Sequence, residues 1–170
     1  MIEPPHAVVQ PRIVCPETGD AVRLDEYVDL WMGNRQSGTI EILGGPGSGK
    51  SAAIALLTKI LPGDVLLLDD APREAVAAAR GTRPVIYSTA CAYRELADVR
   101  LPLAAWGNDE LVEYLMAVHP DRCGCVMTRV AALPDRALPR GVPALWTIIL
   151  ERLVLDDHGG DVRSMLGQAV

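Results

Sequence analysis

Short apolar runs alternate with segments of helical apolar spacing, and this succession predicts the fold. Four apolar runs of strand length are typical of buried parallel strands, and they cover residues 39–43, 65–68, 84–87 and 99–103. Helical segments rich in Ala and Leu separate the first three runs, at residues 51–61 and 72–80. The order strand, helix, strand, helix, strand predicts an α/β fold with a doubly wound, mostly parallel sheet of about four strands.

The segments on either side of this core have different patterns. Residues 1–20 contain four prolines and Gly19, which predicts an extended arm without a regular element. Apolar residues then recur with helical spacing over residues 23–32, and Gly33 with Asn34 ends the predicted helix. We therefore expect three parts: an N-terminal arm at 1–20, an α/β core at 21–106 and a helical lid subdomain at 107–170.

The lid is predicted from residues that favour helix starts. Asn108 is a suitable cap for a helix that reaches Val118. Pro120 begins a second helix, and Pro143 begins a third that runs to about Asp156. A further short helix is expected near the C-terminus.

Composition and charge narrow the classes of partner. The formal net charge is −6 and the basic residues are scattered, so we expect no nucleic-acid partner. No apolar run approaches the ~20 residues of a membrane-spanning helix, and the first residues lack the pattern of a signal peptide. We expect a cytoplasmic protein without membrane association. Of the four cysteines only Cys123 and Cys125 are close in sequence, so we expect reduced thiols, the alternative being half of a zinc site at that pair.

A glycine-rich segment lies between the first predicted strand and the helix that follows it. It fits the pattern G-x-x-x-x-G-K-[ST] at each fixed position and consists of Gly44, Gly45, Pro46, Gly47, Ser48, Gly49, Lys50 and Ser51, with Ala52 next in the helix. Glycines let backbone N–H groups surround phosphate oxygens, and a helix N-terminus favours an anion. Lys50 is expected to reach the outer phosphates and Ser51 to join a Mg²⁺ shell. The segment predicts a nucleoside triphosphate site; the alternative is a flexible glycine-rich turn.

Two acidic residues, Asp69 and Asp70, directly follow the second apolar run. A triphosphate site needs a carboxylate at the tip of a neighbouring strand to hold the magnesium water shell, and we assign this role to Asp69. Asp70 is expected to orient or deprotonate the attacking water, as a catalytic residue beside Lys50. The alternative role for Asp70 is the N-cap of the helix that begins at Pro72.

The third apolar run is followed by Ser88 and Thr89. A hydroxyl at this position is placed to contact a γ-phosphate, so Thr89 is a candidate binding residue. The equal alternative is that two small polar residues simply end the strand. Arg94, a few residues later, reaches either phosphate or a surface salt bridge.

With these motifs in place, residues 22–155 resemble the STAND class of P-loop ATPases, the NACHT and AP-ATPase relatives that act as signalling switches. The phosphate loop and the pair Asp69 and Asp70 are the specific parts of the resemblance. Softer similarities are the helix before the loop, the sensor strand and the Gly141-Val142-Pro143 element of the lid. The resemblance implies a P-loop NTPase that binds ATP or ADP with Mg²⁺, with Pro143 near the adenine, and a protein partner or self-association.

Two features differ from that class. Nineteen positions separate Lys50 from Asp69, too few for the strand and helix that usually intervene, so we expect a sheet smaller by one strand. Arg94 does not directly follow the sensor strand, which weakens the prediction that an arginine senses the γ-phosphate. ATP binding is therefore a firmer expectation than ATP hydrolysis.

Three functions fit these residues. The first is an ATP-dependent switch with slow, Mg²⁺-dependent hydrolysis, in which the lid reports whether ATP or ADP is bound. The second is a small-molecule or nucleotide kinase, although the short connection from Lys50 to Asp69 contains no insertion for an acceptor. The third is a nucleotide-binding interaction module without turnover, because no arginine finger is evident in the sequence.

Overall fold

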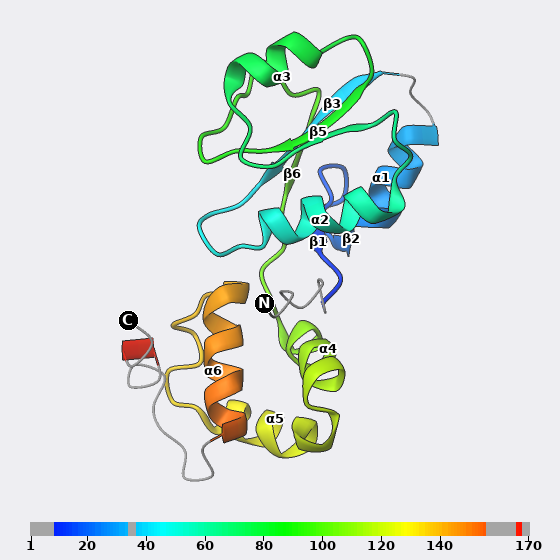
Figure 1. Ribbon diagram of the computed structural model, residues 1–170. Coiled ribbons are helices and arrows are strands. Elements are labelled where there is room, and N and C mark those ends of the chain that lie inside the picture. The colour runs from blue at the N-terminus through cyan, green and yellow to red at the C-terminus, as the bar shows by residue number, and fades with distance from the viewer. Residues whose placement is uncertain (1–8, 34–36, 156–165, 168–170) are drawn as a thin grey trace, which may run out of the picture. The chain divides into compact units, whose positions relative to one another are not determined.

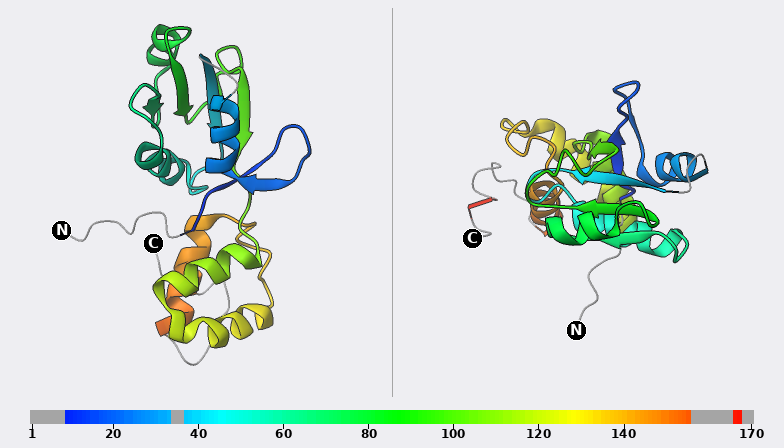
Figure 2. Two further views of the ribbon diagram at one scale, coloured as in Figure 1. Left: turned by 90° about the vertical axis from the view of Figure 1, so that its right-hand side faces the viewer. Right: turned by 90° about the horizontal axis from the view of Figure 1, so that it is seen from above.

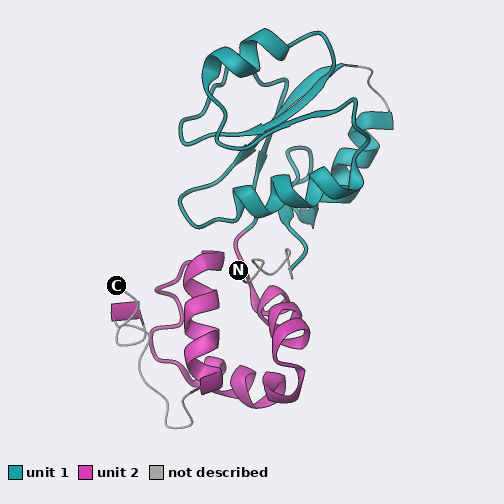
Figure 3. Cartoon of the chain, viewed as in Figure 1, with its two compact units in different colours: residues 1–104 teal, residues 105–170 magenta. Residues whose placement is uncertain are grey.

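The computed structural model describes residues 9–33, 37–155 and 166–167 of the chain. The chain divides into two compact units, residues 1–104 and 105–170 (Figure 3). The first unit is an α/β fold around a four-stranded parallel sheet, and the described part of the second unit is helical. Asn34, an expected helix end, lies outside the described residues, as does most of the expected short helix near the C-terminus.

Four parallel strands form the sheet of the first unit (Figure 1). They are β3 (Gly38–Leu43), β4 (Leu66–Leu68), β5 (Pro84–Ser88) and β6 (Val99–Pro102). Each strand coincides with one of the four apolar runs to within one residue at either end, so the prediction of a four-stranded parallel sheet is confirmed. The strand order is β4-β5-β3-β6.

This order corrects one expectation about Asp69. We expected Asp69 to follow a strand next to the one that leads into the glycine-rich segment, but β5 lies between β3 and β4. The burial of the strands gives the physical reason. All five residues of β5 are buried, as a central position requires, whereas the three residues of β4 are only half-buried and suit an edge.

Helices cover both faces of the sheet. On one face, α1 (Leu24–Gly33) and α2 (Lys50–Ile60) pack on the apolar residues of the strands. The buried side chains there include Leu24, Val28, Trp31, Ala53, Ile54, Leu57, Ile40, Ile42, Ile86 and Leu101. On the other face, α3 (Arg73–Ala79) packs through Val76 on Val85 and Tyr87 of β5. Successive residues of β5 thus contribute to opposite cores, as alternation along a strand requires.

A short antiparallel hairpin precedes α1 and lies beside the edge strand β6. Its strands are β1 (Arg12–Val14) and β2 (Ala21–Arg23). Ile13 forms an isolated bridge with Leu103, and Ala104 N–H donates to the Arg12 carbonyl at 2.8 Å. The prediction that residues 1–20 contain no regular element is therefore wrong at β1, because Ile13 is fully buried against the first core.

Within residues 105–155, the second unit contains three α-helices and one 3-10 turn (Figure 2). They are α4 (Asn108–Val118), η1 (Pro120–Arg122), α5 (Cys123–Ala132) and α6 (Pro143–Leu155). The first and third expected helices are confirmed, whereas at the expected second start Pro120 begins a 3-10 turn and the α-helix follows from Cys123. Asn108 is not the cap of α4. Gly107 precedes the helix and its N–H donates to Glu110 Oε2 at 2.7 Å, while the Asn108 side chain accepts from Arg136 at 3.4 Å.

Two arginines hold the C-terminal end of α6. Arg122 Nη2 donates to the Val154 carbonyl at 3.1 Å, and Arg129 Nη1 donates to the Leu153 carbonyl at 2.5 Å. These cations satisfy carbonyl groups that lack a partner within the helix and complement its negative end. Among the described residues, no helix has the length and apolar character needed to cross a membrane.

Candidate functional site

The segment after β3, residues 44–51, forms a tight turn that leads into α2; we call it the glycine loop. Gly47 and Gly49 have φ angles of 73° and 94°, in the left-handed region that favours glycine. A Cβ on Gly44 would collide with the side chain of Ser48. These three glycines are therefore required by the backbone of the loop itself, whatever it binds.

No side chain caps the N-terminus of α2, so this end of the helix is available to an anion. Gly49 is the N-cap and supplies no side chain to the helix, and the first turn contains no acidic residue. The first N–H groups of an α-helix have no partner within the helix and carry its positive end. Ser48 Oγ is also buried in the loop without a hydrogen-bond partner among the described residues. The N-terminus of α2 therefore suits a bound anionic group, whereas Ser48 is not among the residues that line the cavity at this loop.

Lys50 folds back over the glycine loop. Its Nζ donates to the carbonyl of Gly44 at 2.7 Å and to that of Gly45 at 3.3 Å. The ammonium group is thereby held at the mouth of the loop, close to the N-terminus of α2. Two carbonyl contacts are exchangeable, because a phosphate group offers the same cation stronger, charge-assisted hydrogen bonds.

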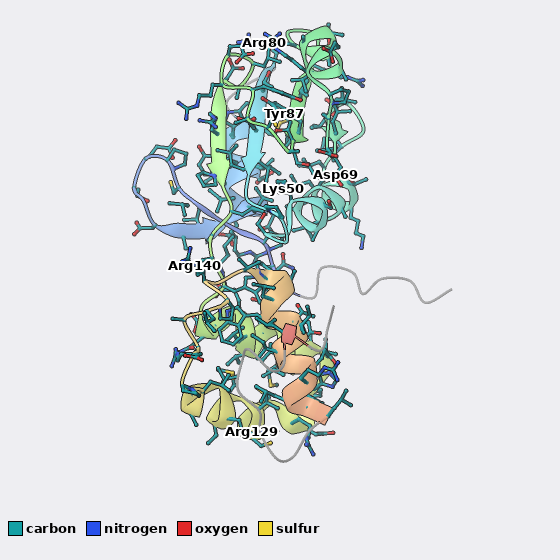
Figure 4. The ribbon with its side chains drawn as sticks, turned by 90° about the vertical axis from the view of Figure 1, so that its left-hand side faces the viewer. Lys50, Asp69, Arg80, Tyr87, Arg129 and Arg140 are labelled. Carbon is teal, nitrogen blue, oxygen red and sulfur yellow. The ribbon has the colours of Figure 1, made fainter. Side chains whose placement is uncertain are left out.

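A cavity of about 370 Å³ opens between the glycine loop and the carboxyl ends of β4 and β5. Its lining residues are Gly44, Gly45, Pro46, Lys50, Ser51, Asp69, Asp70, Ser88 and Ala90. Lys50 and Asp69, both labelled in Figure 4, thus come to one site from different elements. Ligands of open α/β sheets bind outside the carboxyl ends of the strands, so the cavity has the position expected of a binding site.

Ser88, at the end of β5, fixes the acidic turn after β4. Its Oγ donates to Asp69 Oδ1 at 2.6 Å and accepts from the N–H of Asp70 at 3.0 Å. The Ser88 carbonyl also accepts from the N–H of Ala71 at 2.8 Å. Asp70 has a φ of 47°, an uncommon conformation that an Asp side chain tolerates better than most. Asp69 is therefore held at the cavity by Ser88, although its strand β4 is separated from β3 by β5.

Several expected residues of the first unit do not line this cavity, among them Gly47, Ser48 and Gly49 of the glycine loop. Thr89 is buried, and its hydroxyl donates to the Cys91 carbonyl at 2.5 Å, so Ser88 and Ala90 rather than Thr89 line the cavity. Ala52 is exposed on α2 and does not line the cavity. Pro143 is the first residue of α6 in the second unit.

The alternative role for Asp70 as a helix cap is wrong. Pro72 is the N-cap of α3, and no side chain caps that helix. Asp70 instead lines the cavity together with Asp69. Both carboxylates are exposed at this edge of the sheet, where water or a ligand reaches them.

The residues fit a magnesium ion that is held mainly by a ligand and water. Within residues 9–33, 37–155 and 166–167, no three His, Cys, Asp or Glu side chains gather as a metal site. Mg²⁺ in nucleotide sites needs only one or two protein oxygens, because phosphates and water complete its shell. Ser51 and Asp69, which line the same cavity, supply that number.

Sequence reasoning missed two features near this site. The first is Ser88 as the partner of Asp69, which depends on strand order. The second is Glu41, a fully buried carboxylate in the middle of β3, whose only signal was one charge inside an apolar strand. No protein-family model matches the chain, and no curated protein matches it at a significant level.

Proposed function

We propose that the chain is an ATP-binding P-loop protein that hydrolyses ATP slowly with Mg²⁺ and acts as a nucleotide-controlled switch. One observation carries the proposal: Lys50, Ser51 and Asp69 line a single cavity at the carboxyl ends of the strands. In this proposal the glycine loop contributes backbone N–H groups to the same ligand. A cation, a hydroxyl and a carboxylate around such a loop are the groups that a magnesium-bound triphosphate requires.

Each group of the loop has a separate task in this proposal. Backbone N–H groups of the glycine loop and the N-terminus of α2 bind phosphate oxygens. Lys50 Nζ exchanges the carbonyls of Gly44 and Gly45 for the outer phosphates. The charge of Lys50 is thereby already present at the loop before a ligand enters, which lowers the reorganisation needed for binding.

Ser51 and Asp69 would hold Mg²⁺, with Ser88 fixing the orientation of the Asp69 carboxylate. When bound, Mg²⁺ neutralises charge that develops on the phosphates. Asp70 would orient the attacking water, because its side chain lines the cavity directly beside Asp69. General base catalysis by such a group is typically worth about 10²–10⁴ in rate.

Two parts of the proposal rest on the resemblance to the STAND class: that the nucleotide is ATP, and that the protein acts as a switch. The four parallel strands and the helical unit that follows them support it, because that class combines such a core with a helical lid. A partner protein or a second copy of the chain would then receive the signal. The expected role of Pro143 beside the adenine belongs to this part of the proposal.

Calorimetric titration tests the proposal. Wild-type protein should bind ATP and ADP in the presence of Mg²⁺, and Lys50→Ala should abolish or strongly weaken both. Lys59→Ala is the matched control, because it removes the same charge from an exposed position of the same helix. The absence of nucleotide binding in the wild type, or equal effects of the two substitutions, would refute the proposal.

A second candidate is a nucleotide-binding module without turnover. It is favoured by the cavity lining, which includes no arginine among the described residues. Arginine fingers supply about 10³–10⁵ of the rate in related phosphoryl transfer. Release of phosphate from ATP by purified protein separates the two candidates, since the module would bind ATP and release none.

A further inference from the structure

Glu41 is a charged residue that is fully buried in the first unit. It lies on β3, the strand between β5 and β6, and its side chain has no exposed surface. Its carboxylate has two partners: Oε1 accepts from the N–H of Tyr93 at 2.7 Å, and Oε2 pairs with Arg100 Nε at 2.9 Å. Both partners are distant in sequence, so Glu41 ties β3 to Tyr93 in the loop after β5 and to Arg100 on β6.

Stability alone is a weak explanation for this carboxylate. A buried ion pair loses much of its attraction to the cost of leaving water, and apolar replacements are often equally stable. The neighbouring inward residue on this face of β3, Thr39, is also fully buried, and its hydroxyl has no partner among the described residues. Of these two buried polar side chains on the same face of β3, Glu41 therefore has hydrogen-bond partners and Thr39 does not.

The network converges on Tyr93, in the loop that follows β5. Besides the bond from its N–H to Glu41, Tyr93 stacks on Tyr87 with ring centroids 6.3 Å apart. The Tyr87 hydroxyl also donates to the Tyr93 carbonyl at 3.4 Å. Burial, and next the charge of Glu41, raise the pKa of Tyr87, which keeps this hydroxyl protonated as a donor.

Tyr93 belongs to the segment that forms one wall of the cavity. Register places Glu41 beside Tyr87 and Ile42 beside Ser88, so the network lies one residue before the cavity on β5. Ser88 and Ala90 line the cavity, and Tyr93 follows them by a few residues. The wall segment, residues 88–93, is therefore held at one end by Ser88 and at the other by Glu41.

We propose that Glu41 is a positioning residue that holds this wall at the end of the phosphate chain and so lets the site distinguish ATP from ADP. This inference rests on the proposed function and deepens it. In the proposed function, the backbone N–H groups of the glycine loop bind phosphates that both nucleotides share. Asp69, Asp70, Ser88 and Ala90 line the same cavity, and in this inference the third phosphate of ATP reaches them.

The substitution Glu41→Gln tests this role with little change in shape. A carboxylate offers acceptor oxygens to both Tyr93 and Arg100, whereas an amide offers one oxygen and turns its NH₂ group toward the other donor. One of the two bonds must therefore break. Thr39→Val is the matched control, because it removes a buried, unpartnered hydroxyl from the same strand and face.

The readout is the ratio of two dissociation constants, for ADP and for a non-hydrolysable ATP analogue, each with Mg²⁺. In Glu41→Gln the preference for the ATP analogue should fall about tenfold while ADP affinity stays within about twofold, since a lost charge-assisted bond has this order of effect. Thr39→Val should leave the ratio unchanged. An unchanged ratio in a folded Glu41→Gln protein overturns the inference, although nucleotide binding itself, and with it the proposed function, would stand.

If Glu41→Gln does not fold, hydrogen exchange on the wild-type chain tests whether the wall segment distinguishes ATP from ADP. The amides of residues 90–93 should exchange more slowly with the ATP analogue than with ADP, because the third phosphate contacts the anchored wall. Equal exchange in the two complexes overturns the inference. Wild-type protein that binds neither nucleotide refutes the proposed function instead, and the inference with it.

Discussion

The hydroxyl of Ser88 donates a 2.6 Å hydrogen bond to Oδ1 of Asp69, and so joins the ends of two neighbouring strands. The same oxygen accepts from the N–H of Asp70. One side chain from β5 thereby fixes both the carboxylate and the backbone of the turn after β4. The proposed metal site depends on this residue even though the sequence pattern for phosphate binding does not include it.

Ser88→Ala should weaken magnesium-dependent nucleotide binding. The substitution leaves the Asp69 carboxylate without its donor and the Asp70 N–H without its acceptor. Loss of a group that orients a metal ligand typically lowers metal affinity about 10–100-fold. Titrations with Mg²⁺ and with EDTA measure the effect, which should be confined to the Mg²⁺ series. Thr58→Val, which removes a hydroxyl that bonds only within α2, serves as the control.

Gly49→Ala should destabilise the first unit, whereas Gly45→Ala should be tolerated. Gly49 has a φ of 94°, and a residue with a Cβ in the left-handed region costs about 1–2 kcal/mol. A Cβ on Gly45 meets no atom within 4 Å, and its φ is not in that region. Urea unfolding of both variants measures the difference. Equal unfolding free energies for the two would contradict the loop conformation described above.

Asp70→Asn should stop phosphate release without preventing ATP binding. Asparagine matches the size of aspartate and tolerates the φ of 47° at this position, so the turn is kept. It cannot accept a proton from water, and release should fall by about 100-fold or more. Phosphate release and calorimetry on the same preparation provide the measurement. Release at the wild-type rate would exclude Asp70 as the group that activates water.

Glu151 should make the second unit sensitive to acid. Its Oε1 accepts from the Tyr114 hydroxyl at 2.6 Å and lies 2.9 Å from His119 Nε2. Burial alone would raise the pKa of Glu151, but the hydrogen bonds from Tyr114 and His119 together bring it below the ordinary value of 4.5. A carboxylate whose pKa is lowered by folding stabilises the folded protein at pH values above its ordinary pKa. This contribution is lost as the pH falls through the pKa of the folded state.

Unfolding free energies between about pH 6 and about pH 3 check this expectation. The wild type should lose more stability across this range than Glu151→Gln, in which the titrating group is gone. Other carboxylates titrate in both proteins and cancel in the comparison. Parallel curves would show that the hydrogen bonds of Glu151 do not favour its charged form.

Features that depend on neighbouring residues in the sequence were predicted well. The glycine loop places its glycines, Lys50 and Ser51 within a few positions of one another, and Pro143 begins its helix as expected. The four strands follow from apolar runs that are each long enough to be buried. Such signals are local, because caps, turns and periodicity act over a single element.

Features that depend on which elements meet were not predicted. The insertion of β5 between β3 and β4 follows from how deeply each strand can be buried, which no single run reveals. The pairing of Ser88 with Asp69 is a consequence of that order. The partners of Glu41 likewise come from residues more than fifty positions away.

The contact of Ile13 and Arg12 with Leu103 and Ala104 also bears on how the first unit is made. Nearly the whole unit lies between the two halves of this contact in the sequence. During synthesis, the hairpin of β1 and β2 is made before the four strands of the sheet, and β6 is the last of those strands. Contacts of such long sequence separation form late and slow the folding of a domain. The buried side chain of Ile13 must therefore wait for β6 before its final burial is complete.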